Sequence, residues 1–359
     1  MATIALAGGG TGGHVYPALA IADVLKGRGH TVLYYGDPER LEARVAPERG
    51  YPFRPVRALQ YPRGGLMGKV RFAIGLLRST WATRSQLKAD GVDVVLGVGG
   101  YISAPPVLAA WTLGRGRAVH EANVVPGLAN KLCARVAQAV LLTYEKTRGR
   151  MPGSAPRHVV GVPVNPKVLA GDRAQAAARY GLDPARPVVL LVGGSLGAKR
   201  INELAIALAN RLRTFQVLHL CGPKYEAEVR QALPELPADY VLVPYEDRMG
   251  DAYAMADLIV ARAGSSTLAE ITAVGKPSLL IPSPNVTENH QEGNARGLED
   301  AGAAEVQVEQ GWDEFAVVQR VERLVANTEH LAGMSANALT QARLDAADRA
   351  ADVVESLAR

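Results

Sequence analysis

The sequence predicts an α/β protein with two doubly wound, Rossmann-like domains in tandem. Short, near-continuous apolar runs alternate with helical patterns, which is typical of parallel sheets covered on both faces. The pattern stops at a proline-rich turn around Pro163 and then starts again. Each half also carries a glycine-rich loop directly after its first apolar run. Together these observations favour two nucleotide-binding-type domains over one large core.

The individual elements follow from this alternation. In the first half we expect strands at 3–7, 31–35, 92–98, 118–120 and 139–142, with helices around 17–28, 39–49, 69–87, 104–113 and 127–135. In the second half we expect strands at 188–192, 217–220, 240–243, 258–260 and 278–281. The Ala-rich segment 337–357 is predicted to be one helix. We therefore place domains at 1–163 and 164–337, with a C-terminal helix, 338–359, that joins the first domain.

Composition narrows the class of protein. The 359 residues carry a formal charge of +5, which fits anionic ligands or an anionic surface better than a dedicated nucleic-acid binder. Cys133 and Cys221 lie in apolar segments, as expected for buried free thiols in a reducing compartment. No basic segment precedes the first strand, so no signal peptide is expected. No apolar run reaches the length of a membrane span.

The first glycine loop, 8–14, is the centre of the predicted site. Gly8, Gly10 and Gly13 fit the dinucleotide pattern G-x-G-x-x-G, and Asp37 follows the next strand where a ribose-binding acid would sit. More generally, such a loop brings backbone N–H groups and a helix N-terminus to an anionic group. His14 on the first helical turn is a candidate proton acceptor. The alternative is a helix-capping histidine in a dehydrogenase.

The second half repeats the arrangement at 193–198. Ser195 can donate its hydroxyl to a phosphate, and the following helix supplies its N-terminus. The alternative is simply a tight turn between strand and helix. Two such loops in facing domains fit a cleft that holds two anionic ligands.

Two later segments suit a sugar nucleotide. The small residues at 262–269 allow close approach of a ligand, and Glu270 can accept hydrogen bonds from both ribose hydroxyls. The alternative for Glu270 is a capping box with Ser266 or Thr267. Gln291 and Asn294 share one helical face, where their amides suit sugar hydroxyls, unless they are merely solvated.

Back in the first half, glycines 97, 99 and 100 form a third loop, and polar residues follow the next strand. Because open parallel sheets bind ligands at the carboxyl ends of their strands, we expect one site to gather several side chains there. These are His14, Tyr101, His120, Glu121 and Asn123. His120 is alternatively an interior histidine.

The segment 66–81 interleaves basic and apolar residues. We expect part of it to pack in the core and the excess of apolar residues to dock on an anionic bilayer. The candidate membrane residues are Leu66, Lys69, Arg71, Phe72, Arg78 and Trp81.

Metal chemistry finds little support in the sequence. We find no D-x-D motif in a loop and no cluster of His or Cys ligands. We therefore expect no metal and no other cofactor.

Taken together, these motifs resemble the MurG family, the UDP-N-acetylglucosamine (UDP-GlcNAc) dependent transferases of peptidoglycan synthesis. The similarity covers nearly the whole chain in order, through the segments 9–14, 99–103, 120–123, 193–198, 262–270 and 290–295. It implies a GT-B fold, in which two domains face each other across a cleft. It also implies inverting transfer of GlcNAc from UDP-GlcNAc to the C4 hydroxyl of MurNAc in lipid I, giving lipid II for cell-wall biogenesis, and hence for cell shape and division. The implied location is peripheral, on the cytoplasmic face of the plasma membrane.

The resemblance also implies roles for individual residues. Thr11, Gly12, Gly13 and Asn123 would face the donor sugar and diphosphate, Ser195 would bind donor phosphate, and the backbone near Glu246 would meet uracil. Gln291 and Asn294 would hold GlcNAc. The nucleotide would be surrounded by Ser265, Ser266, Thr267, Leu268, Ala269 and Glu270, and the acceptor by Gly100, Tyr101 and Ser103.

Two positions depart from the family pattern. Asn165 stands where the family has a donor-contacting arginine, and Leu196 replaces a glutamine of the second loop. Asn165 carries no charge and cannot supply the charge contact of that arginine.

We expect His14 to be the general base, because its ordinary pKa of about 6.5 suits proton transfer near neutral pH. Glu121 is the second candidate, as an orienting group or as the base. Other functions remain open at this point: another UDP-sugar GT-B enzyme such as a lipid glycosyltransferase or a UDP-GlcNAc epimerase, a nicotinamide-dependent oxidoreductase, or a non-catalytic nucleotide-sugar sensor.

Overall fold

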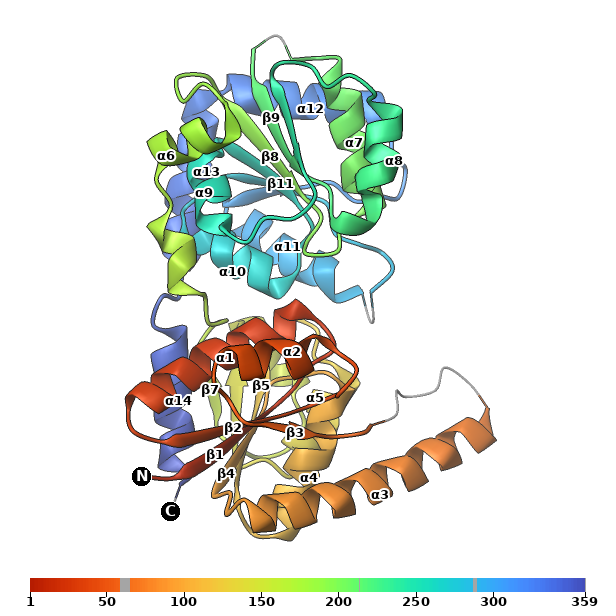
Figure 1. Cartoon of the computed structure of the whole chain (residues 1–359), viewed down its shortest axis with the longest axis vertical. Helices are drawn as coiled ribbons and strands as arrows, with labels where there is room; N and C mark the ends of the chain where they lie inside the picture. The colour runs from red at the N-terminus through yellow and green to blue at the C-terminus, as the bar shows by residue number, and fades with distance from the viewer. Residues whose placement is uncertain (59–64, 213, 287–288, 359) are drawn as a thin grey trace. The chain divides into compact units, whose positions relative to one another are not determined.

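The computed structural model describes residues 1–58, 65–212, 214–286 and 289–358, apart from the side chain of residue 66 (Figure 1). The chain forms two compact units. Unit 1 comprises Met1–Val164 and Arg343–Arg359, and unit 2 comprises Asn165–Ala342. Each unit is a parallel sheet covered by helices, so the predicted pair of doubly wound α/β domains is confirmed.

Among the described residues, the sheet of unit 1 has seven parallel strands in the order β3-β2-β1-β4-β5-β6-β7. The first strand, β1, lies beside the central strand β4 and is buried from Ile4 to Ala7, and alternate residues enter separate cores on the two faces of the sheet. This double burial explains why the strand reads as a continuous apolar run. The strands are β1 (Thr3–Ala7), β2 (Thr31–Gly36), β3 (Phe53–Pro55), β4 (Val94–Gly97), β5 (Gly116–Glu121), β6 (Ala139–Leu142) and β7 (Arg157–Val159).

Helices connect these strands. In α1 the apolar positions Leu19, Ile21, Ala22 and Leu25 are all buried against the sheet, as their spacing predicts. The connecting elements are α1 (Gly12–Gly27), α2 (Leu41–Glu48), α3 (Leu66–Ala89), the 3-10 turn η1 (Tyr101–Ser103), α4 (Ala104–Thr112), α5 (Leu128–Ala134) and the 3-10 turn η2 (Glu145–Arg150).

The C-terminal segment does not form the single helix predicted over 337–357. It consists of α13 (Thr328–Gln341) in unit 2 and α14 (Ala346–Ser356) in unit 1, separated where Ala342 takes an extended conformation. Helix α14 lies against α1 (Figure 1), with Ala350 and Val354 in the core of unit 1. Arg28, the C-cap of α1, pairs with the α14 carboxylates of Asp348, Asp352 and Glu355, at 2.6–3.0 Å.

Unit 2 repeats the architecture with six parallel strands among the described residues, in the order β10-β9-β8-β11-β12-β13. The strands are β8 (Val188–Val192), β9 (Gln216–Leu220), β10 (Tyr240–Val243), β11 (Leu258–Ala261), β12 (Ser278–Leu280) and β13 (Ala304–Val306). The helices are α6 (Arg173–Tyr180), α7 (Lys199–Ala209), α8 (Glu226–Ala232), α9 (Met249–Met255), α10 (Ser265–Ala273), α11 (His290–Asp300) and α12 (Glu314–Ala326), with 3-10 turns η3 (Pro166–Ala170) and η4 (Pro223–Tyr225).

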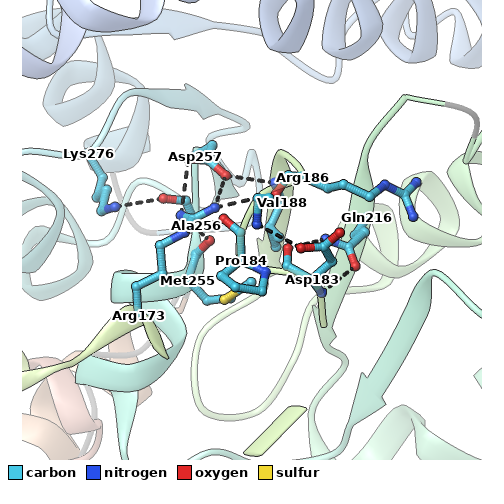
Figure 2. A network of polar contacts seen from close by, with 11 residues as sticks. Arg173, Asp183, Pro184, Arg186, Val188, Gln216, Met255, Ala256, Asp257 and Lys276 are labelled. Atoms are coloured by element: carbon cyan, nitrogen blue, oxygen red, sulfur yellow. Dashed lines mark hydrogen bonds and ion pairs between the residues drawn. The ribbon is translucent and has the colours of Figure 1, made fainter. Parts of the chain in front are cut away.

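A polar network fastens the amino ends of these strands (Figure 2). The Arg173 guanidinium donates to both carboxylate oxygens of Asp257, at 2.8 and 3.1 Å, and Asp257 also accepts the backbone N–H of Val188. Lys276 donates from Nζ to the carbonyl of Ala256 at 2.7 Å. The network ties the start of α6 to the amino ends of β8 and β11.

Candidate active site

Each sheet has one point where the strand order reverses, and in such folds ligands bind at the carboxyl ends of the strands beside it. In unit 1 the point lies between β1 and β4, and in unit 2 between β8 and β11. The loops that leave these strands are the predicted glycine loops 8–13 and 97–100 in unit 1, and the predicted segments 193–198 and 262–264 in unit 2. Topology therefore brings two separate motifs together into one candidate site on each unit.

His14 lies on the first turn of α1 and is half-buried. Its Nδ1 is 3.3 Å from the carbonyl oxygen of Gly9 and 3.3 Å from Oγ1 of Thr11. When Nδ1 carries the proton and donates to the carbonyl, the lone pair is on Nε2. That tautomer is the one a general base needs.

The loop after β4 packs directly on His14. A Cβ on Gly99 would come within 2.7 Å of the imidazole, and one on Gly100 within 2.7 Å of the Gly9 carbonyl, and both residues have positive φ angles. These two glycines therefore allow the loop to reach the histidine. Ser103 is buried and donates to the carbonyl of Gly100 at 2.8 Å, so it shapes this loop.

Tyr101 brings Asp37 into the same region. Its hydroxyl donates to Asp37 Oδ2 at 3.3 Å, and Asp37 Oδ1 accepts the N–H of Glu39. The carboxylate that resembled a ribose ligand thus contributes to loop structure.

Glu121 ends β5 and is buried. Oε1 accepts the backbone and side-chain N–H groups of Asn123, at 2.9 and 3.3 Å, and Oε2 accepts the N–H of Gly127 and the amide of Asn130, at 3.0 and 2.8 Å. Burial raises the pKa of Glu121 even so. The carboxylate holds the loop that carries Asn123, which is the geometry of an orienting group.

His120 is an interior residue, which agrees with the structural alternative. It is buried, and its Nε2 donates to the carbonyl of Gly161 at 2.8 Å. Burial lowers its pKa to about 4, so it is neutral at physiological pH.

In unit 2 the first loop is a tight turn that also exposes Ser195. Gly197 N–H donates to the Gly194 carbonyl at 3.0 Å, and both glycines have positive φ angles. A Cβ on Gly197 would overlap the Cys221 carbonyl, so this close packing requires glycine. Leu196 beside Ser195 is 76% exposed.

Helix α10 begins at Ser265, with Gly264 as its N-cap. Glu270 therefore lies beyond the first turn, where a capping-box residue cannot be, and that interpretation is wrong. Its Oε2 instead accepts the hydroxyl of fully buried Tyr253 at 2.8 Å. Burial raises the pKa of Glu270, and the Tyr253 bond opposes the rise.

The two amides of α11 are both oriented by backbone groups. Gln291 Oε1 accepts the N–H of Ser283 at 2.9 Å, which leaves its NH₂ group to be presented as a donor. Asn294 is fully buried, and its Nδ2 donates to the carbonyl of Ala263 at 3.2 Å. Asn294 thus braces the loop before α10.

Two predicted donor residues have their side chains engaged elsewhere. Buried Glu246 accepts hydrogen bonds from Arg179 at 3.0 Å, from the Tyr180 hydroxyl at 2.6 Å and from the Arg248 N–H at 2.7 Å. Asn165 accepts the N–H of Lys167 and caps η3. The predicted contact with uracil uses the backbone near Glu246 and not this side chain, so it stays a prediction.

Two residues carry no signal in the sequence. Glu42 and Tyr253 are buried polar side chains directly behind the first glycine loop and behind Glu270. No periodic pattern marks either of them, because each acquires its role only through the tertiary fold.

Helix α3 carries an exposed apolar stripe, which we call the α3 surface. It consists of Met67, Val70, Ile74, Leu77 and Trp81, which are 46–86% exposed and spaced three or four residues apart. Lys69, Arg71 and Arg78 flank it in exposed positions, and Phe72 is half-buried. Helix α3 packs on α4. Within the predicted segment 66–81, Leu76 packs against the core of unit 1 and Thr80 is buried, while the buried Thr83 and Leu87 lie beyond it. The side chain of Leu66 lies outside what the structure describes.

The described residues include neither a membrane-spanning helix nor a candidate metal site. None of the helices described is long and apolar enough to cross a membrane. Within the same part of the chain, no group of three or more His, Cys, Asp or Glu residues is placed to hold a metal ion. Cys133 and Cys221 are buried and free, as predicted.

Comparisons with known proteins agree with this arrangement. Residues 4–142 match the glycosyltransferase family 28 N-terminal domain, and residues 188–350 match the C-terminal domain of that family. The chain is 41% identical, over 99% of its length and 96% of the relative's, to a UDP-N-acetylglucosamine–N-acetylmuramyl-(pentapeptide) pyrophosphoryl-undecaprenol N-acetylglucosamine transferase of Clavibacter sepedonicus. It is 36% identical to the protein of the same name from Halothermothrix orenii, over 98% of both chains.

A solved structure extends the similarity to three dimensions. The crystal structure of MurG from Acinetobacter baumannii superimposes with a TM-score of 0.80 at 29% identity, covering 99% of this chain and 100% of that one. The chain therefore belongs to glycosyltransferase family 28 and, within it, to the MurG family.

Proposed function

We propose that this protein transfers GlcNAc from UDP-GlcNAc to the C4 hydroxyl of MurNAc in lipid I, with inversion at the anomeric carbon, and so forms lipid II. The observation that carries the proposal is the full-length similarity to transferases named for this donor and acceptor. A nicotinamide-dependent oxidoreductase or an epimerase would not account for that similarity.

The donor site belongs to unit 2 in this proposal. Ser195 and the N-terminus of α7 bind the diphosphate, and the residues from Ser265 to Glu270 surround the nucleotide. Glu270 receives the ribose hydroxyls while Tyr253 holds the carboxylate in place. Gln291 donates its NH₂ group to GlcNAc, because its oxygen is committed to Ser283.

The reacting groups belong to unit 1. The acceptor hydroxyl gives its proton to His14 Nε2 as its oxygen attacks the anomeric carbon, and UDP leaves with the electron pair of the broken C–O bond. Thr11, Gly12 and Gly13 present the N-terminus of α1 to the anionic groups, with Asn123 beside them on the loop that Glu121 holds. Gly100 and Tyr101 contribute to the acceptor side. We propose that this charge stabilisation needs no metal or other cofactor.

The α3 surface is the proposed membrane contact. Its five apolar side chains and three flanking cations suit the interface of an anionic bilayer, where an undecaprenyl acceptor resides. We propose that unit 1 docks peripherally on the cytoplasmic leaflet through this helix.

The direct test of the reaction is incubation with labelled UDP-GlcNAc and a lipid I analogue, with each substrate omitted in turn. Transfer should require both, and conversion of UDP-GlcNAc without acceptor would indicate an epimerase instead. His14→Ala should lower turnover by about 10²–10⁴-fold, the usual contribution of a general base, with little change in UDP affinity. His158→Ala, an exposed histidine of the same unit, is the matched control. Near-normal turnover of His14→Ala at pH 8 would remove His14 from this role.

Membrane docking has its own test. Charge reversal at Lys69, Arg71 and Arg78 should weaken binding to anionic liposomes by at least about 100-fold, since each basic residue near such a surface contributes roughly 1 kcal/mol and each introduced carboxylate adds repulsion. The same reversal at Lys224, Arg230 and Arg323, exposed on unit 2, should leave binding unchanged. Turnover of water-soluble acceptors should survive in both variants. If the first variant binds liposomes normally, the docking surface lies elsewhere.

A further inference from the structure

A buried carboxylate lies beneath the first glycine loop. Glu42 is the second residue of α2 and is fully buried. Its Oε2 accepts the N–H of Gly10 at 3.2 Å, and its Oε1 accepts the N–H of Asp37 at 3.1 Å. Its contacts in the described part of the chain include no Lys, Arg or His side chain within ion-pairing distance. A buried carboxylate satisfied only by backbone donors exerts a strong local field.

The position of Glu42 relative to His14 is specific. The N–H of Gly10 and the carbonyl of Gly9 belong to one peptide group. Glu42 binds the N–H end of this group, and Nδ1 of His14 lies 3.3 Å from its carbonyl oxygen. A Cβ on Gly9 would overlap the Glu42 carboxylate, so glycine is required for this contact.

We propose that Glu42 acts through the Gly9–Gly10 peptide group as the positioning residue for His14. The negative charge polarises the peptide group and makes the Gly9 carbonyl a stronger acceptor. Nδ1–H then donates to this carbonyl, the lone pair stays on Nε2, and the imidazolium formed during the reaction is stabilised. The Thr11 hydroxyl, also 3.3 Å from Nδ1, faces an N–H and can only accept from it.

The proton balance is simple. The O–H bond of the acceptor hydroxyl breaks and an N–H bond forms at Nε2, and the proton is not passed on to Glu42. As in a directly bonded carboxylate–histidine pair, a carboxylate orients the imidazole and stabilises its charged form, but here a peptide group lies between the two side chains. Glu121 orients the loop that carries Asn123, and Glu42 orients His14, although no pattern in the sequence marks Glu42. The inference rests on the proposed role of His14 as base.

The resting protein allows a test that needs no catalysis. The ¹⁵N spectrum of the wild-type imidazole should show the Nδ1–H tautomer of His14, with His14→Gln used to assign its resonances. A dominant Nε2–H tautomer would overturn the proposal without any further variant.

Glu42→Gln then tests the charge. Loss of a negative charge across one peptide group should lower the NMR pKa of His14 by about 0.5–1 unit. It should lower turnover by up to about 3–10-fold, shift the acid limb of the pH–rate profile to lower pH, and leave KM for UDP-GlcNAc within about two-fold. Glu48→Gln removes an exposed charge from the same helix and is the matched control.

The outcomes separate the two proposals. An unchanged His14 pKa in Glu42→Gln refutes the coupling even if His14 is the base. A shifted pKa with normal turnover leaves the coupling intact and refutes His14 as the base. A purely structural role for Glu42 would lower stability and raise KM without moving the pKa.

Discussion

Glu121→Gln distinguishes a catalytic carboxylate from an orienting one. The wild-type side chain accepts four hydrogen bonds, two at each oxygen. Glutamine keeps one oxygen, and its NH₂ group must face two other donors. Two hydrogen bonds to a charged acceptor are then lost, each worth about 1.5–3 kcal/mol, so the upper estimate is roughly 3–6 kcal/mol. Because whole domains are stable by only about 5–15 kcal/mol, unit 1 should be visibly destabilised.

The assay combines hydrogen exchange with kinetics. Exchange in peptides spanning residues 116–134 should accelerate strongly in Glu121→Gln, while peptides of unit 2 exchange as before. Glu48→Gln, whose side chain is 56% exposed, should change neither. Activity should fall in proportion to the disorder of the loop. Unchanged exchange, together with turnover slowed by about 10³-fold, would refute this reasoning and make Glu121 a reacting group.

Three further predictions concern the polar groups of both units. Tyr253→Phe removes the hydrogen bond to Glu270 and should weaken UDP binding by about 10-fold. The loss should be larger at pH 6 than at pH 8, because the pKa of Glu270 rises without that bond. A calorimetric titration that shows unchanged UDP affinity would exclude a role for Tyr253 in the nucleotide site. Burial lowers the pKa of His120 to about 4 and of His219 to about 3, so each neutral imidazole stabilises the folded state fully above the unfolded pKa of about 6.5. As pH falls towards the folded pKa, that stability is lost by about 1.4 kcal/mol per pH unit. His120→Gln should flatten this pH dependence in unit 1 alone, and urea titrations at pH 7 and 4.5 that show the wild-type slope would contradict it. Transfer should persist in EDTA, and loss that Mg²⁺ or Mn²⁺ restores would show that a metal carries the diphosphate charge.

The fold was largely predictable because the central strands are buried on both faces. The buried strands β1, β6 and β8 match their predicted bounds, because a short run of apolar residues between turns is typical of a strand buried on both faces. The half-buried edge strand β10 also matches its predicted bounds. The strands β3, β7 and β13 were missed. Each has only three residues at or near a sheet edge, too few for a period of two to be recognised.

Local propensity also misled in two places. The Ala-rich C-terminal segment favours an uninterrupted helix, yet packing divides it at Ala342. The spacing of Thr267 and Glu270 resembled a cap, yet the helix begins at Ser265 and the carboxylate turns to Tyr253. The glycine loops indicated the site because close backbone approach requires glycine, and glycine is visible in the sequence. Glu42 and Tyr253 left none, because a buried polar residue is recognised only from the partners that the fold supplies.

The return of α14 to unit 1 has a consequence for how the protein folds as it is synthesised. Domains generally fold in order as the chain emerges from the ribosome. Here all of unit 2 must emerge before α14 can place Ala350 and Val354 in the core of unit 1. The first unit to be made is thus the last to be completed. Until then α14 does not cover α1, and the nascent chain exposes apolar surface that chaperones recognise.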